Sequence, residues 1–152
     1  MKRFTFALEP ALRLRKRAEE QALEELAAKR RALAREREQL AELHRELGRH
    51  EQLRATMQRS ASGASITVDV RELADSAKYG EQLTRLLFAQ EARVMEAQRA
   101  EATALQAANA RRLDREALDR LRERRLEEHR REGMRLEQEA LDEAAVLRWR
   151  FR

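Results

Sequence analysis

The stretch SASGAS, residues 60–65, decides the fold of this 152-residue chain. It is the one run of small and polar residues in a sequence with a single Pro and four Gly, and such runs favour loops over regular structure. The residues on both sides are mostly Leu, Ala, Glu and Arg, which are strong helix formers. The sequence therefore predicts a helix over about 10–60, a loop over about 61–68 and a second helix over about 69–150.

The first predicted helix carries leucines at a spacing of seven residues. One row of this heptad repeat comprises Leu12, Leu26, Leu33, Leu40 and Leu47. The second row is mixed and comprises Leu8, Ala22, Lys29, Glu36, Leu43 and His50. A narrow apolar stripe with polar members is typical of a two-stranded coiled coil and not of a helix inside a globular core.

The second predicted helix has a start signal directly after the loop. Asp69 can accept hydrogen bonds from the unpaired N–H groups of a first turn, and Glu72 follows three residues later, as in a capping box. Val68 and Leu73 stand where the two partners of a hydrophobic staple are found. From there the sequence contains no further proline, and Leu and Ala recur at mostly helical spacings.

Two long helices joined by a short loop are expected to pack antiparallel, because neither helix can bury its apolar stripe alone. The predicted fold class is therefore all-α: two long helices that form an antiparallel coiled-coil hairpin, with the C-terminal helix longer. A turn between residues 64 and 65 would pair Leu47 with Leu83, Leu26 with Leu105 and Leu12 with Leu118. At 1.5 Å per residue the helices would be roughly 75 Å and roughly 120 Å long. Residues beyond about 120 would then have no partner within the chain.

Charge and apolar surface point to the end of the hairpin where both termini lie. The net charge is +5, and the excess of basic residues is concentrated in residues 1–17 and 111–135. The hairpin would bring residues 1–17 beside residues 111–120. The apolar stripe of the unpaired C-terminal overhang would have to fray or dock on another molecule, so we expect this end to bind a partner.

The composition excludes several classes of protein. A charged fraction of 40% and an aromatic fraction of 4% do not fit a globular domain with a large core. Because the chain has no Cys, it has no disulfide, thiolate metal site or cysteine nucleophile. It contains neither a phosphate-binding glycine loop nor an H-E-x-x-H motif, so we expect no catalysis, no cofactor and no metal ion. No apolar run approaches the roughly 20 residues that span a bilayer, and the start does not fit a signal peptide. We therefore expect a cytoplasmic protein without direct membrane insertion.

Two short stretches allow more than one interpretation. The Arg-rich residues 120–131 include three glutamates and no aromatic residue, so nucleic-acid binding is not expected. They form either a solvated helix face or a docking site for an acidic protein surface. Just after the loop, one helical stripe comprises Tyr79, Leu83, Leu86 and Gln90. Leu83 fits the seam, the line of contact between the two helices, whereas Tyr79, Leu86 and neighbouring Phe88 fit either the seam or an exposed partner face.

The ends of the chain resemble a known family. They read Phe4-x-Phe6-x-Leu8-Glu-Pro-x-Leu12-Arg-x-Arg15 at the start, and Arg124-Arg-Leu-Glu-Glu-His followed by Glu137-Gln-Glu-x-Leu-Asp-Glu143 further on. With the length, the break after about 60 residues and the near-absence of Gly and Pro elsewhere, these stretches resemble the flagellar export protein FliJ over essentially the whole chain. The resemblance implies a non-enzymatic, soluble component of the flagellar type III export apparatus, similar to the gamma stalk of rotary ATPases.

The resemblance also implies partners and sites. In this family the end with both termini inserts into the ring of the export ATPase FliI, held with its regulator FliH at the cytoplasmic face of the membrane, and promotes ring assembly and activity. The ring-docking residues implied here are Phe4, Phe6, Arg13, Arg122, Arg125, Leu126 and Trp149. The hairpin also contacts the export gate FlhA and carries export chaperones. The gate-binding stripe implied here consists of Tyr79, Leu83, Leu86 and Gln90.

Two alternative functions stay open from the sequence. One is the stalk of a virulence type III secretion ATPase, which would use the same physics in a different machine. The other is a structural coiled-coil protein that pairs with itself and buries its overhangs against a second copy. Both alternatives keep the hairpin fold and change only the partner.

Overall fold

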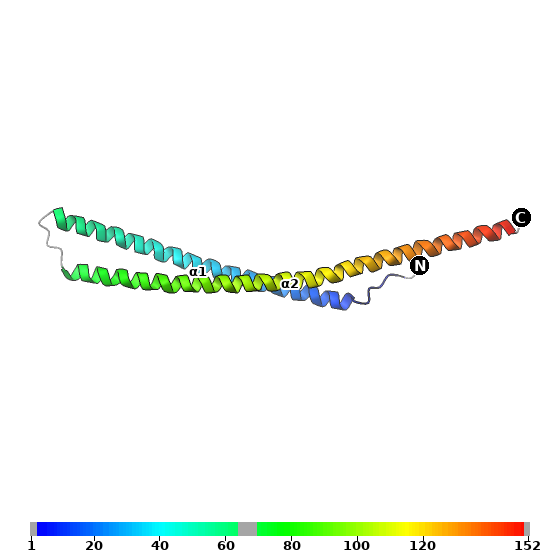
Figure 1. Ribbon diagram of the computed structural model, residues 1–152, viewed down its shortest axis with the longest axis horizontal. Helices are drawn as coiled ribbons and strands as arrows, with labels where there is room; N and C mark the ends of the chain where they lie inside the picture. Colours follow the sequence, from blue (N-terminus) through cyan, green and yellow to red (C-terminus); the bar gives the residue numbers. More distant parts are fainter. Residues whose placement is uncertain (1–2, 64–69, 151–152) are drawn as a thin grey trace. The chain divides into compact units, whose positions relative to one another are not determined.

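The structure is a computed structural model that describes residues 3–63 and 70–150. Within these ranges it contains two helices and no strand: α1 spans Glu9–Gly63 and α2 spans Val70–Arg150 (Figure 1). The helices pack against each other as an antiparallel hairpin. The predicted all-α fold class is confirmed.

The start of α1 is closed by backbone hydrogen bonds. The N–H of Glu9 donates to the carbonyl oxygen of Phe6 at 3.1 Å, and the N–H of Leu12 donates to that of Leu8 at 2.9 Å. Pro10 stands in the first turn, where its missing N–H would have no partner inside the helix. The helix therefore begins one residue before the predicted start.

The end of α1 lies beyond the predicted boundary. Residues 61–63, which were predicted to belong to the loop, are helical, and the helix ends at Gly63. Ala and Ser are compatible with a helix, and Gly63 is the first residue of this stretch with a strong preference against one. The predicted capping residues Val68 and Asp69 lie outside the described residues.

The described residues form two compact groups. The terminal half comprises residues 3–23 and 107–150, and the loop half comprises residues 24–63 and 70–106. In each half the partner on α2 falls in number as the residue on α1 rises, which makes the pairing antiparallel. The pairs are Glu9 with Arg122 and Arg15 with Asp114 in the terminal half, and Glu36 with Gln90 and His50 with Ser76 in the loop half.

The core of the loop half is a single row of apolar side chains. It consists of Leu26, Leu33, Leu83, Leu87 and Val94, each at most 8% exposed. Full burial of one such side chain contributes about 1.5–3 kcal/mol relative to leaving it exposed. Two polar residues lie in the same seam, His50 and Gln90, at 9% and 5% exposure.

The seam agrees with the predicted heptad in part. Leu26 and Leu33 are buried as predicted, while Lys29 of the mixed row is exposed. Leu105, predicted to lie opposite Leu26, keeps 37% of its surface exposed, and Ala104 beside it is more buried. The buried position on α2 is therefore shifted by one residue from the predicted one. The reason is that a helical turn of 3.6 residues does not match the 3.5 residues per turn of a heptad repeat.

In the terminal half, α2 is covered beyond the point at which α1 begins. Leu12 is the most buried large side chain, at 1% exposure. Residues 3–8 are not helical and lie against α2 over residues 121–132. The expectation that residues beyond about 120 have no partner is therefore wrong for residues 121–132. Residues 134–149 are all exposed.

Candidate docking surfaces

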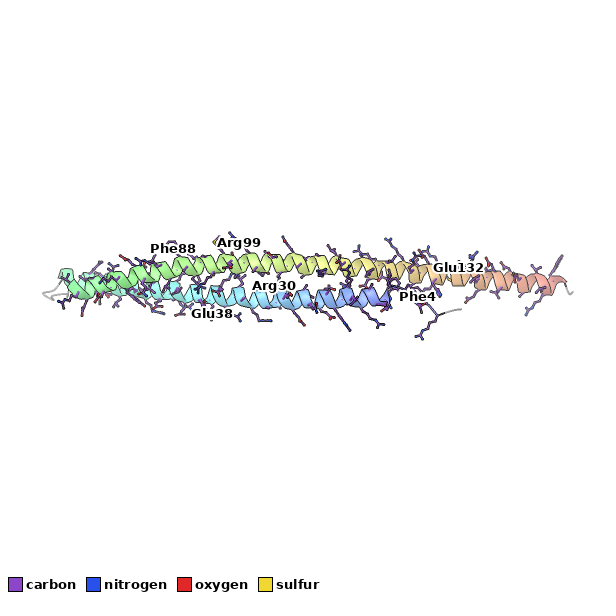
Figure 2. The ribbon with its side chains drawn as sticks, turned by 90° about the horizontal axis from the view of Figure 1, so that it is seen from below. Phe4, Arg30, Glu38, Phe88, Arg99 and Glu132 are labelled. Carbon is purple, nitrogen blue, oxygen red and sulfur yellow. The ribbon has the colours of Figure 1, made fainter. Side chains whose placement is uncertain are left out.

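The predicted ring-docking residues lie in the terminal half, on residues 3–8, α1 and α2. Phe4 and Phe6 are half-buried against α2. The ring of Phe4 lies edge-on to the imidazole of His129, with ring centroids 5.5 Å apart and planes at 64°. Figure 2 shows Phe4 beside the part of α2 that carries Glu132. An open groove of about 900 Å³ lies here, and Arg125 lines it as well.

The predicted docking arginines all have acidic partners. Arg122 lies 3.4 Å from Glu9, and Arg13 reaches the same carboxylate at 4.0 Å. Arg125 donates to Glu128 at 3.1 Å. Exposed ion pairs of this kind contribute little to stability, but each carboxylate reduces the positive potential that a partner meets. The surface is therefore of mixed charge, although its sequence has an excess of arginine.

A more buried ion network joins α1 and α2 in this half. The guanidinium of Arg115 donates to Glu19 at 2.6 Å and to Asp119 at 2.7 Å. The hydrogen bond to Glu19, followed by that to Asp119, raises the pKa of Arg115 above its usual value. These three side chains are at most 27% exposed, so the network fixes α1 on α2 next to the predicted docking residues.

The stretch of α2 at residues 134–149 has no cover from the described residues. It carries six large exposed apolar side chains: Met134, Leu136, Leu141, Val146, Leu147 and Trp149. Trp149 is the most exposed of them, at 83%. It lies about 35 Å along the helix from Leu126, at 1.5 Å rise per residue. The predicted ring-docking residues thus fall into two groups, one beside residues 3–8 and one on this bare stretch.

The predicted gate-binding stripe is divided by the seam. Leu83 and Gln90 are buried against α1, at 3% and 5% exposure, whereas Tyr79 and Leu86 are 41% and 47% exposed. The side-chain amide of Gln90 donates to the backbone carbonyl of Glu36 at 3.0 Å and to its carboxylate at 2.6 Å. Two of the four residues can therefore meet a partner in this conformation, and the other two hold α2 on α1.

Tyr79 belongs to a small polar cluster between the helices. Its hydroxyl donates to the carboxylate of Glu46, and its ring lies edge-on to that of His50 at 5.2 Å. His50 Nε2 in turn lies 3.1 Å from the hydroxyl of Ser76. The hydrogen bond to Glu46, then burial and the charge of Glu46, raise the pKa of Tyr79 above its usual value.

The raised pKa of Tyr79 predicts a loss of stability in alkali. The folded state prefers the neutral phenol, so the contribution is fully present below the unfolded pKa of about 10 and is lost as the pH rises through the folded pKa. We expect the melting temperature of the native chain to fall more steeply above pH 10 than that of Tyr79→Phe. Because the chain has one Tyr, phenolate absorbance reports the titration directly. Parallel pH dependence of the two proteins would contradict the assignment.

Gly80 allows the close approach of His50. A Cβ atom at Gly80 would lie 3.0 Å from Cε1 of His50, whereas one at Gly48 would meet nothing within 4 Å. Gly48→Ala should therefore stabilise α1 by about 1 kcal/mol, the difference in helix propensity. Gly80→Ala should yield none of this gain, because the imidazole must move away from Ser76. Thermal unfolding followed by circular dichroism compares the two variants. Equal increases in melting temperature would show that the His50 side chain moves aside without cost.

Phe88 marks a second exposed feature of the loop half. It is 69% exposed and points away from α1 (Figure 2). It lines a groove of about 490 Å³ together with His50, Gly80 and Thr84. The partner face considered for Tyr79, Leu86 and Phe88 thus consists of exposed residues, although Phe88 does not share the stripe of the other two.

One contact of the terminal half escaped the sequence interpretation. The ring of Phe4 lies against the imidazole of His129. The signal was present in Phe4 and Phe6, which are separated by one residue, the period of an extended chain. This alternation favours a segment laid along a helix, whereas only the helix that starts after it was predicted.

Over residues 3–63 and 70–150, no helix is long and apolar enough to cross a membrane. Within the same ranges, no group of three or more His, Cys, Asp or Glu side chains is arranged to hold a metal ion.

Comparisons with known proteins identify the family. The family model described as flagellar FliJ protein matches residues 4–152, essentially the whole chain. Comparisons with curated proteins and with solved structures gave no match. The match covers both helices and residues 4–8 before α1, so it applies to the hairpin as a whole. The chain belongs to the flagellar FliJ family and is a coiled-coil protein associated with flagellar export.

Proposed function

We propose that this chain is a non-enzymatic stalk of the flagellar type III export apparatus, whose terminal half inserts into the ring of the export ATPase FliI. In this proposal it promotes ring assembly and ATP hydrolysis, in company with the regulator FliH. It works in the cytoplasm, peripherally associated with the membrane at the export apparatus. It also links the ring to the export gate FlhA and to export chaperones.

One observation carries the ring-docking part of the proposal. The helix α2 continues through residues 134–149 with every described side chain exposed, including Trp149 at 83%. A helix that displays six large apolar side chains to water is stabilised when a partner covers them. A ring with an apolar inner surface is a partner of suitable shape for a single long helix.

A stalk of this kind would act on catalysis through binding alone. It can shift the conformational equilibrium of a ring subunit only as far as its affinities for the two conformations differ. The bare stretch carries apolar residues on more than one side of the helix, because Leu141 and Val146 lie about 140° apart at 100° per residue. Different subunits would therefore meet different side chains of the same helix.

The test measures ATP turnover by the purified export ATPase with added stalk protein. The native chain should stimulate turnover, and a truncation after Arg122 should not. The sharper variant is Leu141→Ser with Trp149→Ser, which changes two exposed residues and leaves the seam intact. Because buried apolar anchors contribute most of the binding energy of an interface, we expect this double variant to bind the ATPase about tenfold more weakly or worse.

The matched control is Leu53→Ser with Met95→Ser. These residues are also exposed, both at 54%, and lie in the loop half, outside the part that is proposed to insert. They should leave stimulation unchanged. No stimulation by the native chain, or equal effects of the two double variants, would overturn the proposed docking surface.

For the gate, we propose that Tyr79 and Leu86 make the contact and that Leu83 and Gln90 support them by holding α2 on α1. Leu86→Ser should weaken binding to the purified cytoplasmic domain of the gate without changing the melting temperature. Met95→Ser is the control, because Met95 is similarly exposed, at 54%, and nine residues place it on the opposite side of the helix from Leu86. Equal losses for the two variants would remove Leu86 from the gate-binding surface.

The self-associating alternative makes a different prediction for the free chain. Pairing of two overhangs would cover residues 134–149 without the ATPase. Sedimentation equilibrium separates the two, since the stalk proposal expects a monomer in the absence of its ring. A dimer that Leu141→Ser with Trp149→Ser converts to a monomer would favour the structural coiled coil.

A further inference from the structure

Residues 3–6 lie along α2 without regular secondary structure, and residues 7–8 form a turn that leads into α1. Phe4 and Phe6 are half-buried, whereas Arg3, Thr5 and Ala7 are exposed, and the alternation ends at Leu8, which is also exposed. Alternation with a period of two is the mark of an extended chain with one side on a surface. The surface here is α2, where the Phe4 ring meets His129 at 5.5 Å. This segment takes the place that α1 occupies earlier along the seam.

The segment is held loosely. Within the described residues, no hydrogen bond joins residues 3–8 to α2, and the groove between them is open, with a volume of about 900 Å³. The nearest ion pair between the two elements is that of Glu9 and Arg122 at the start of α1. An extended segment attached by two half-buried rings must offset the loss of its own conformational freedom. It can therefore leave the helix without unfolding the seam.

The helix face beneath the segment continues into the bare stretch. Leu126 and His129 are half-buried there, and Gly133, Leu136 and Ala140 follow on the same face at spacings of four, three and four residues. Beyond Gly133 this face is open to solvent. A partner helix that lies along Leu136 and Ala140 would run directly into the ring of Phe4.

The groove itself has no net preference for charge. Two arginines, Arg3 and Arg125, and two glutamates, Glu128 and Glu132, line it together with Phe4, Phe6 and Leu121. An apolar helix with a mixed polar rim fits this lining better than a strongly acidic or basic partner does.

We infer that residues 3–8 form a displaceable strap that covers α2 over residues 121–132 and competes with the partner helix for that face. The identity of the competitor, a helix of the export ATPase ring, rests on the proposed function. The partner would bind the bare stretch first and then replace the strap. The ring-docking surface is therefore complete only after Phe4 and Phe6 have left His129.

A reversible lock tests the inference. The chain has no cysteine, so Thr5→Cys with Glu128→Cys places the only two thiols on the exposed residues that flank the groove. A bis-methanethiosulfonate cross-linker joins them and is cleaved by reductant. We expect the locked chain to bind the export ATPase about tenfold more weakly, and reduction to restore the native affinity. The control, Arg30→Cys with Glu101→Cys, locks α1 to α2 in the loop half, where the native guanidinium and carboxylate lie 3.0 Å apart, and it should bind equally well before and after reduction.

The outcomes separate the strap from the proposed function. Equal or tighter binding by the locked chain would overturn the strap and leave the ring-docking proposal intact. Absence of binding by the native, locked and reduced chains alike would refute the ring-docking proposal. The strap is then tested on the free chain. Hydrogen exchange of residues 121–132 is compared between the native chain and the double variant Phe4→Ser with Phe6→Ser. Faster exchange confined to those residues supports the strap, and unchanged exchange overturns it.

Discussion

Leu83→Ala is expected to destabilise the loop half by about 3 kcal/mol, the usual cost of removing a buried leucine side chain. Leu83 is 3% exposed and lies in the one apolar row that holds α1 to α2 in this half. A seam one side chain wide has few neighbours that can move into the cavity. Leu86→Ala, three residues further along at 47% exposure, should cost less than about 0.5 kcal/mol.

The measurement that separates the two is chemical denaturation combined with hydrogen exchange. Exchange should accelerate in Leu83→Ala at residues 70–106 and at the α1 residues opposite, and should stay near native in Leu86→Ala. The same comparison shows why the gate-binding test uses Leu86 and not Leu83. A variant of Leu83 would bind the gate less well through local unfolding alone. A small effect of Leu83→Ala would mean that the seam is not a firm contact in solution.

The hairpin could be predicted from the sequence because its signals are repeated many times. Leucines at heptad spacing, as at Leu26 and Leu33, each point to the same seam, and one run of small residues interrupts the helices. The exact end of α1 could not be predicted, because Ala61 and Ser62 are compatible with both helix and loop. Helix termini depend on single residues, whereas a stripe is an average over a whole helix.

The candidate surfaces could be predicted less well, for two physical reasons. Helical periodicity placed Tyr79, Leu83, Leu86 and Gln90 on one stripe. This stripe is wider than the seam, so part of it is buried against α1 and part is exposed to solvent. Hydropathy could not show that Gln90 lies on the buried side, because its burial depends on one acceptor, Glu36, far away in sequence. The position of residues 3–8 depends likewise on a tertiary contact.

The hydrogen-bonded pair of buried Gln90 and half-buried Glu36 leads to the second large expected effect. Gln90→Leu should destabilise the loop half by about 2 kcal/mol, because the carboxylate of Glu36 loses its donor in a half-buried place. The double variant Glu36→Leu with Gln90→Leu should recover at least native stability, since apolar replacement of both partners of a polar contact is neutral or stabilising. A double-mutant cycle from chemical denaturation measures the coupling.

The same double variant should lose the fixed register of the hairpin. Leucine stripes tolerate a slip of one helix along the other, whereas a buried polar pair is satisfied in one alignment only. Arg30 and Glu101 meet at 3.0 Å in the native register, so cysteines at these two positions should cross-link efficiently in an otherwise native chain and less efficiently in the Leu–Leu background. A stable double variant with undiminished cross-linking would show that the apolar row alone sets the register. Reduced cross-linking would mean that Gln90 lowers the stability of the hairpin but fixes its register. In that register Leu86 is exposed and Leu83 is buried.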